Sequence, residues 1–231
     1  LITLAVPPKT LTMAEAKEQC KEWGEECVLF EKEADMLQAF LDLIEDSDII
    51  TGWNSEGYDI PYTVNRVSRV LSKDDTRRFC LWKQLPKKRE YEKYGKTAET
   101  YDFIGRVHLD SLELYRKYTY EERHTYRLDA IGEIEVGENK VPYEGTLDQL
   151  YNNDFRKFIE YNIQDTALLD KLDKKLRFID LSNSIAHENT VLLQTTMGAV
   201  AVTEPGIINE AHGRDLRVPN RPKRDDESTA A

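Results

Sequence analysis

The stretch GWNSEGYDIPY, residues 52–62, joins a predicted strand to a predicted helix and places one carboxylate at the junction. The apolar run Ile49–Trp53 predicts a buried strand. Pro61 suits the first turn of a helix, which we expect to run to about Leu71. Asp59 then lies at the edge of a sheet, where open α/β folds bind ligands. The alternative is that Asp59 only caps this helix, a contribution of ~0.5 to 2 kcal/mol.

Strands and helices alternate on both sides of this stretch. Further strands are predicted at residues 1–6, 27–30 and 106–110, and helices at 13–23, 34–46, 111–118, 128–134 and 155–187, the last one bent or broken near 179–184. Residues 80–107, with the polar tip KYGKTAE, predict a β-hairpin. The alternation predicts an α/β core, to which the hairpin and a helical C-terminal part are added.

The composition limits the classes of function. The chain has 231 residues with 40% hydrophobic content, which is enough to bury a core, and its net charge of -11 means that any contact with nucleic acid is local. Its three cysteines form no CxxC pair, which favours reduced thiols over structural zinc. No apolar run approaches the ~18 residues of a membrane span, and no signal peptide is recognisable. We therefore expect a cytoplasmic protein that does not bind membranes.

A second group of polar residues lies in YNIQDTALLD, residues 161–170. Tyr161 and Asp165 are four residues apart, so they share one face of the predicted helix. Taken alone, they are better explained as a solvated polar pair. Tyr161 and Asp165 tell more about function when they are considered together with GWNSEGYDIPY.

Both stretches resemble motifs of one family. GWNSEGYDIPY is similar to the second exonuclease motif of family B DNA polymerases, and YNIQD is similar to the third, with its Tyr-x-x-x-Asp pattern. The stretches VHLDSLELYRKYTY (107–120), YRLDAIGEIEVGENKVPYEG (126–145) and FIDLS (178–182) follow the same family in order and spacing. The similarity runs from about residue 28 to residue 220 and is strongest to polymerases of T-even-like bacteriophages and their marine relatives.

The resemblance implies an RNase H-like proofreading domain of the DEDDy type, a 3′→5′ exonuclease that acts on the 3′ end of single-stranded DNA. In such sites two divalent cations, Mg²⁺ or Mn²⁺, lie ~3.5 to 4 Å apart and promote phosphodiester cleavage. By this resemblance Asp59 and Asp165 are metal ligands and Tyr161 orients the attacking water. By the same resemblance Asn54 would help to hold the primer terminus. We expect Tyr58, Tyr62 and Trp53 to be able to stack on single-stranded bases, although Trp53 is better explained as a core residue.

Two groups of cations are candidates for contacts with DNA. They are Lys87, Lys88 and Arg89 in the hairpin, and Lys171, Lys174, Lys175 and Arg177 on the long helix. The resemblance implies that the hairpin helps to move a primer end between polymerase and exonuclease sites. Either group would contact phosphates without sequence preference. The alternative is that both are ordinary solvated surface charges.

The sequence departs from the family at its first motif, a strand that carries Asp-x-Glu. Residues 1–6 contain no acid, so we expect the first strand of the core to be missing, and the match at residues 225–227 lies in a charged tail. Of the four metal-site acids that the family implies, two remain in this sequence, Asp59 and Asp165. Two carboxylates hold two close cations poorly, and we expect weak or absent metal binding by this chain.

The expected organisation is a partial exonuclease domain at residues 1–187, a helical connection at 188–220 and a disordered tail at 221–231. The polymerase palm and the N-terminal domains are expected to be missing from this chain, whose location would be the host cytoplasm if a phage encodes it. The alternative function is a non-catalytic single-stranded DNA-binding or assembly module with the same fold. A third reading is an unrelated acidic α/β protein whose motifs match by chance.

Overall fold

The computed structural model describes residues 1–93, 95–138 and 141–220. The chain divides into two compact units, Leu1–Ile179 and Asp180–Ala231, which we call the first and the second unit. The predicted tail at 221–231 lies outside the described residues. The predicted domain boundary after residue 187 stays a prediction.

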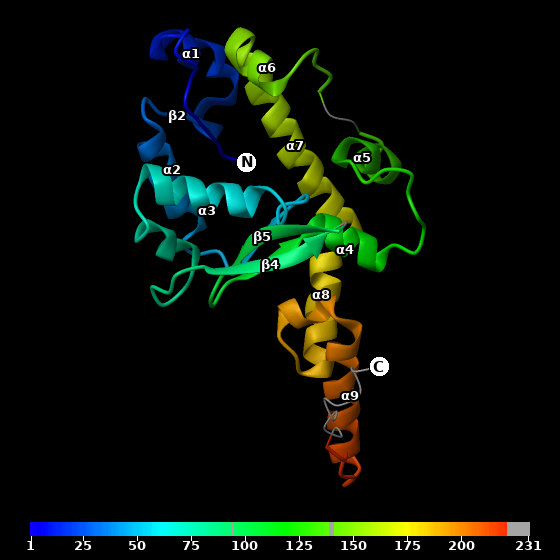
Figure 1. Ribbon diagram of the computed structural model, residues 1–231. Coiled ribbons are helices and arrows are strands. Elements are labelled where there is room, and N and C mark those ends of the chain that lie inside the picture. Colours follow the sequence, from blue (N-terminus) through cyan, green and yellow to red (C-terminus); the bar gives the residue numbers. More distant parts are fainter. Residues whose placement is uncertain (94, 139–140, 221–231) are drawn as a thin grey trace. The chain divides into compact units, whose positions relative to one another are not determined.

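The first unit mixes helices with short strands (Figure 1). Its elements are β1 (Thr3–Ala5), α1 (Met13–Gln19), η1 (Lys21–Glu26), β2 (Cys27–Leu29), α2 (Glu33–Ile44), β3 (Ile49–Gly52), α3 (Asp59–Val70), η2 (Asp75–Phe79), β4 (Lys87–Lys93), β5 (Lys96–Asp102), β6 (Val107–Asp110), α4 (Ser111–Tyr118), α5 (Leu128–Val136), α6 (Leu147–Asn153) and α7 (Phe155–Leu176). The predicted mixture of α and β structure is confirmed.

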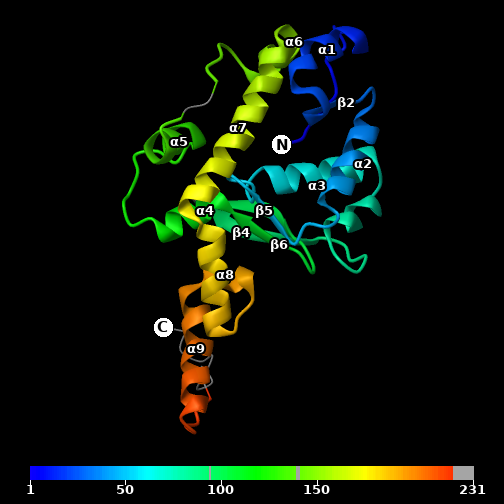
Figure 2. The same ribbon diagram turned by 180° about the vertical axis from the view of Figure 1, so that it is seen from behind.

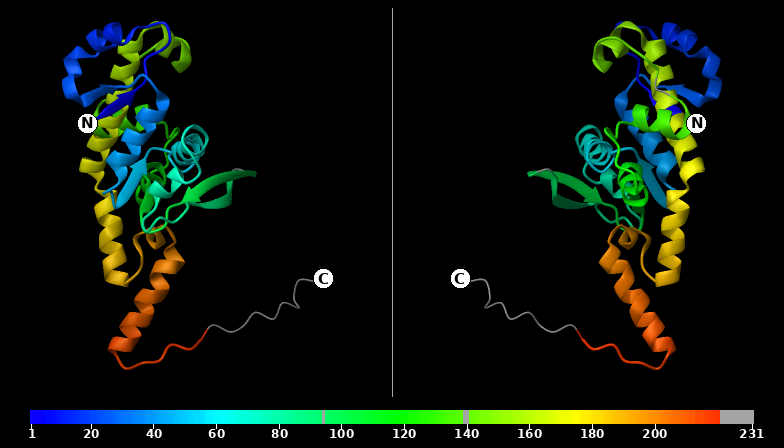
Figure 3. Two further views of the ribbon diagram at one scale, coloured as in Figure 1. Left: turned by 90° about the vertical axis from the view of Figure 1, so that its left-hand side faces the viewer. Right: turned by 90° about the vertical axis from the view of Figure 1, so that its right-hand side faces the viewer.

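The described strands form three two-stranded sheets. β1 pairs with β2 and β3 pairs with β6, both in parallel, whereas β4 and β5 form the expected antiparallel hairpin. The hairpin projects away from the helices of the first unit (Figure 3). In the β3–β6 pair, Gly52 lies opposite Asp110, so the chain leaves both strands at the same edge. This edge carries the stretch with which the sequence analysis began.

β3 differs from its prediction in length and burial. It ends at Gly52, one residue earlier than expected, and its residues are half-buried, apart from Thr51, which is exposed. The sequence predicts a buried strand. Within the described residues β6 is its only partner, so β3 is not enclosed by strands on both edges.

One hydrophobic core lies between α2, α3 and η2. Ile60, Val64 and Val67 recur at helical spacing and form the buried face of α3. They pack in one cluster with Leu41 of α2 and Phe79 of η2. Figure 2 shows α2 and α3 side by side. Because this face anchors α3, it fixes the end of the turn that leads into α3.

The long helix α7 joins two further cores. Phe155 and Ile159 pack near its N-terminal end in a cluster that includes β1 and α1, and Leu168 and Leu172 pack against α5. A Cβ atom at Gly132 of α5 would lie only 2.7 Å from a methyl carbon of Leu168, so glycine permits this close approach. Residues 161 and 165 lie between the two cores, and packing on both sides fixes their position.

The break in the long helical pattern is not where the sequence predicts it. α7 ends at Leu176, Arg177 adopts the left-handed conformation with φ 53°, and α8 (Phe178–Asn189) begins at once. The predicted break therefore exists, but it lies at Arg177, two residues before the range 179–184 near which it was expected. The ring of Phe178, the first residue of α8, lies 5.5 Å from that of Tyr118 and 6.4 Å from that of Tyr115, measured between centroids. These contacts join the start of α8 to α4.

Several short elements were not predicted, among them α6. Its signal is nonetheless present in the sequence, because Thr146 and Gln149 form a capping box in which each side chain bonds the backbone N–H of the other. The three cysteines, Cys20, Cys27 and Cys80, are buried and free, as the composition indicated.

The second unit is helical in its described part. Most of α8, followed by η3 (Leu193–Met197) and α9 (Ala199–Gly213), makes up this unit. Asn209 of α9 donates a 2.9 Å hydrogen bond to Thr190 Oγ1, which joins α9 to the end of α8. Across the described parts of both units, no helix combines the length and the apolar character needed to cross a bilayer.

Candidate functional site

The turn between β3 and α3 needs particular residues. A Cβ atom at Gly52 would lie 2.8 Å from the Cβ of Ser55, so a larger residue there would collide with the turn. Asn54 has φ 59°, a left-handed conformation that asparagine adopts more readily than most residues. The N–H of Ile60 then bonds the carbonyl of Ser55 at 2.9 Å. The residues Gly-Trp-Asn-Ser thus specify a tight turn.

Asp110 at the end of β6 holds this turn in place. Its Oδ1 accepts hydrogen bonds of 2.9 Å from the N–H groups of Asn54 and Leu112, and its Oδ2 accepts one of 3.0 Å from Glu56 N–H. The side chain is buried, and burial raises the pKa of Asp110 although these three N–H groups lower it. Sequence analysis missed this residue. The available signal was an aspartate directly before a predicted helix, which is typical of an N-cap.

Trp53 fixes the other side of the turn. Its Nε1 donates a 3.0 Å hydrogen bond to the carbonyl of Tyr126, and its ring lies 6.0 Å from that of Tyr115. Trp53 therefore packs against the core formed by α4, α5 and α7. This contact ties the end of β3 to the chain segment that leads into α5.

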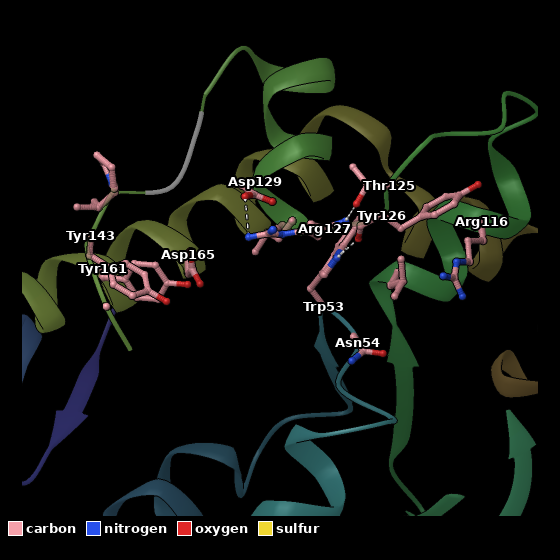
Figure 4. A pocket seen from close by; sticks show the side chains of 15 residues that line it. Trp53, Asn54, Arg116, Thr125, Tyr126, Arg127, Asp129, Tyr143, Tyr161 and Asp165 are labelled. Carbon is pink, nitrogen blue, oxygen red and sulfur yellow. Dashed lines mark hydrogen bonds and ion pairs between the residues drawn. The ribbon is translucent and has the colours of Figure 1, made fainter. Parts of the chain in front are cut away.

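A pocket of about 920 Å³ opens beside this turn (Figure 4). Its walls come from the β3–α3 turn, from α4, from the segment around the start of α5, from the loop before α6, and from α7. The side chains of interest in the lining are Trp53, Asn54, Arg116, Tyr126, Arg127, Asp129, Tyr143, Tyr161 and Asp165. The structure thus brings Asn54, Tyr161 and Asp165 to one pocket, although more than a hundred residues separate the first from the others. Such volumes are typical of ligand sites.

Tyr161 and Asp165 project from α7 on the same side, as their spacing indicated. The ring of Tyr161 meets that of Tyr143 edge to face, with 5.1 Å between the centroids and 84° between the planes. This contact orients the Tyr161 ring from the loop before α6. Sequence analysis missed Tyr143, since nothing in its local pattern indicates a contact with α7.

Asp59 and Tyr58 lie on α3 and at its start, and neither is among the residues that line this pocket. The Asp59 side chain is exposed, but protein atoms around its carboxyl group partly desolvate it and raise its pKa. Tyr58 stacks on Tyr62, with centroids 5.8 Å apart and planes at 6°. Both rings are more than half exposed. The sequence-predicted site residues therefore fall into two groups, one in the pocket and one on α3.

Two of the three hairpin cations, Lys88 and Arg89, are paired with acids. Lys88 lies 2.6 Å from a carboxylate oxygen of Glu99, and Arg89 bonds both Asp102, at 3.0 Å, and Glu56. Lys87 is exposed. Because Glu56 belongs to the β3–α3 turn, Arg89 links the hairpin to the site.

The lysines predicted to form a basic stripe on α7 are also paired. Their partners are Glu138 for Lys171 at 2.6 Å, Asp170 for Lys174 at 2.6 Å and Glu135 for Lys175 at 3.3 Å. These ion pairs reduce the positive field that either group of cations presents to a polyanion.

The carboxylates of the described residues do not by themselves suit a two-metal centre. Within residues 1–93, 95–138 and 141–220, no group of three or more His, Cys, Asp or Glu side chains is placed to hold a metal ion. Asp165 lines the pocket, whereas Asp59 lies on α3 outside its lining. Two close divalent cations need more oxygen ligands than these two carboxylates supply.

His108 of β6 is half-buried beneath the turn, and we expect it to make the stability depend on pH. His108 of β6 shares a 2.9 Å hydrogen bond with Ser55 Oγ. Burial lowers the pKa of His108, an effect that nearby Arg89 reinforces and that Glu56 and Asp102 oppose. The unfolded chain therefore binds a proton more readily. The stability that neutral His108 contributes is complete above the unfolded pKa of about 6.5 and is lost as the pH falls through 6.5 toward the lowered folded value.

We expect His108→Gln to flatten the fall in the free energy of unfolding between pH 7.5 and 5.5. The fall in the free energy of unfolding should be smaller in the variant by about 1.4 kcal/mol for each unit by which folding lowers the pKa of His108. Urea unfolding can be followed by tryptophan fluorescence, because Trp23, Trp53 and Trp82 all belong to the first unit. His187→Gln, in the second unit, is the matched control. An unchanged pH slope in the His108 variant would contradict this assignment.

The fold and site define a mixed α/β domain with a polar pocket beside the carboxyl ends of two parallel strands. The family model described as DNA polymerase family B, exonuclease domain, matches residues 5–131, which is more than half of the chain. The chain therefore belongs to this family, and the resemblance found in the sequence is confirmed.

Individual relatives agree with the family. The DNA-directed DNA polymerase of Enterobacteria phage T4 is 30% identical over 194 residues, which are 83% of this chain and 22% of that protein. The DNA-directed DNA polymerase of Escherichia phage RB69 is 27% identical over 192 residues, 82% of this chain and 21% of the relative. A DNA polymerase of Autographa californica nuclear polyhedrosis virus is 30% identical over 168 residues, 69% of this chain and 17% of the relative. The chain spans about a fifth of the length of the two phage relatives.

Proposed function

We propose that this chain forms part of a 3′→5′ exonuclease site that removes the 3′-terminal nucleotide of single-stranded DNA within a larger family B polymerase. The observation that supports the proposal best is the meeting of Asn54, Tyr161 and Asp165 at one pocket. An RNase H-like core is part of the proposal. The parallel β3–β6 pair, with the site turn at its carboxyl end, is compatible with such a core.

Each pocket residue has a role that its chemistry allows. The Asn54 amide can donate hydrogen bonds to the sugar and phosphate of a terminal nucleotide. The Tyr161 hydroxyl can orient a water, and the edge-to-face contact with Tyr143 holds its ring in one direction. Asp165 and Asp59 provide carboxylates. In this proposal Tyr58, stacked on Tyr62 and largely exposed, offers a face for a base, and Lys87, Lys88 and Arg89 act through phosphates.

We expect the chain by itself to bind Mg²⁺ or Mn²⁺ weakly or not at all. The reason is that its two candidate carboxylates lie on different helices and only one lines the pocket. Calorimetric titration should show no saturable binding tighter than about 1 mM. Asp165→Asn is the control and should give the same trace. Submicromolar binding that this variant abolishes would show that the chain holds a complete centre.

A chimera tests the proposed function. The segment of the phage T4 polymerase that aligns with this chain is replaced by residues 5–220, and a 5′-labelled single-stranded oligonucleotide is incubated with the chimera and Mg²⁺. We expect successive loss of nucleotides from the 3′ end, and no loss with Asp165→Asn. Asp148→Asn, which removes an exposed first-turn acid of α6, should retain activity. A folded but inert chimera would contradict the proposal.

The second candidate is a non-catalytic single-stranded DNA-binding or assembly module. It is compatible with the described residues, among which no group of three or more His, Cys, Asp or Glu side chains is placed to hold a metal ion. It predicts salt-dependent binding of oligonucleotides with no cleavage even in the chimera. Neutralising Lys171, Lys174 and Lys175 together should then weaken binding. The same cleavage assay therefore separates the two functions.

A further inference from the structure

We infer that Arg127 is a phosphate-binding residue of the pocket, which leaves Asp129 and donates to the backbone of a single DNA strand lying there. The inference rests on the proposed function and names a contact that the sequence motifs do not assign. With this contact, the wall of the pocket provides part of the phosphate binding that is otherwise proposed for the hairpin cations.

Arg127 lies in the wall of the pocket, at the start of α5. It is the residue that directly precedes this helix. In the view of Figure 4 it lies between Asp165 on α7 and Trp53 at the end of β3. A strand whose terminal nucleotide reaches Tyr161 and Asp165 would enter the same pocket, and Arg127 forms part of its wall.

The present partner of Arg127 is easily given up. Its Nη2 lies 3.4 Å from Asp129 Oδ2, and the Arg127 side chain is 78% exposed. Exposed pairs of this kind contribute about 0 to 1 kcal/mol. Asp129 lies in the first turn of α5, where its Oδ1 already accepts a 2.9 Å hydrogen bond from Ala130 N–H. The helix N-terminus therefore continues to stabilise Asp129 after Arg127 has moved.

The lining of the pocket contains both acids and arginines. Asp129 and Asp165 are acidic and repel a phosphate, so a strand in the pocket needs a cation close by. Arg116, also in the lining, is 3.2 Å from Glu113 and lies over the ring of Tyr126 at 4.7 Å. Arg127 combines a place in the lining, high exposure and a long ion pair. A guanidinium can also bind a phosphate through two parallel hydrogen bonds.

Two variants separate this role from a structural one. Arg127→Gln and Asp129→Asn each remove the same ion pair. If the pair only stabilised the fold, both changes would act on DNA binding in the same direction. If Arg127 binds phosphate, the first weakens binding, and the second strengthens it by removing a competitor and a repulsive charge.

The measurement uses the full chain and a 5′-fluorescein oligo(dT) of about 12 nucleotides. Fluorescence anisotropy gives Kd over a series of KCl concentrations in EDTA. We expect Arg127→Gln to raise Kd about tenfold at low salt, and to reduce the slope of log K against log salt by about 0.7. Asp129→Asn should lower Kd several-fold. The effects should therefore have opposite signs.

Matched controls remove the general effect of net charge. Arg156→Gln changes an exposed arginine that is paired with Glu22 at 2.8 Å outside the pocket. Asp148→Asn changes a first-turn acid of another helix. Both should remain within about twofold of the unchanged chain.

The outcomes distinguish the inference from the function on which it rests. If the unchanged chain binds the oligonucleotide and Arg127→Gln matches Arg156→Gln in Kd and salt slope, the inference is overturned and the proposed function stands. Shifts of Arg127→Gln and Asp129→Asn in the same direction also overturn it. If the unchanged chain does not bind single strands at all, the proposed function fails together with the inference.

Discussion

Replacing Asp110 with Ala should lower the free energy of unfolding of the first unit by about 2 to 4 kcal/mol. The Asp110 carboxylate accepts the N–H groups of Asn54, Glu56 and Leu112, and it is 6% exposed. Its removal leaves these donors without this acceptor, and the hydrogen bond of Leu112 N–H lies in a buried contact. The variant no longer bears the free-energy cost of burying a carboxylate, but this gain offsets only part of the loss of the three hydrogen bonds. Urea unfolding followed by tryptophan fluorescence measures the change.

Asp154→Ala is the matched control for Asp110. Asp154 caps α7 by accepting Lys157 N–H at 3.0 Å, but it is exposed and holds no distant turn. Loss of such a cap costs about 1 kcal/mol. The excess loss in Asp110→Ala therefore measures how strongly β6 holds the β3–α3 turn. Equal losses in the two variants would show that Asp110 acts only as a helix cap.

Arg106→Met should destabilise the first unit by about 3 to 5 kcal/mol. Arg106 is 3% exposed, and its guanidinium donates to four backbone carbonyls. These are Glu45 and Ser47, both at 2.6 Å, Arg78 at 3.2 Å and Phe79 at 3.3 Å. They belong to the turn after α2 and to the end of η2. Methionine fills a similar volume but leaves these carbonyls without donors.

Arg77→Met controls for the loss of an arginine as such. Arg77 also donates to a carbonyl, that of Lys83 at 2.8 Å, but it lies at the surface beside Asp74. We expect less than about 1 kcal/mol for this variant. Arg106→Lys should fall between the two, since one ammonium group cannot reach all four carbonyls. If Arg106→Met unfolds at the same urea concentration as Arg77→Met, the carbonyl network contributes little.

Local sequence predicted the elements that carry the site. The apolar run before Gly52 and the proline at 61 placed a strand and a helix around the turn, and both exist with shifts of one or two residues. The spacing of Tyr161 and Asp165 placed them on one side of a helix, which α7 confirms. Such predictions succeed because helix and strand periodicity depends on neighbours in the chain.

The contacts that assemble the site follow no such local pattern. Asp110 reaches Asn54 across 56 residues and Arg106 reaches Glu45 across 61, so neither partner is visible in the sequence around the other. Arg127 and Tyr143 face the pocket only because α5 and the loop before α6 lie near α7. The same holds for the lysines of α7. Their spacing resembles a basic surface, but acids from distant segments pair with two of them.

By itself, then, the sequence determined the family, the order of the longer elements of the first unit and the residues whose type suits nuclease chemistry, because motifs and periodicity are properties of short stretches. Only the tertiary structure decided that Asn54, Tyr161 and Asp165 meet at one pocket while Asp59 lies outside its lining. It also decided which cations are paired with acids and that α7 ends at Leu176. The reason is that packing and ion pairing join side chains far apart in the chain, and their partners are set only when the helices and strands have packed together.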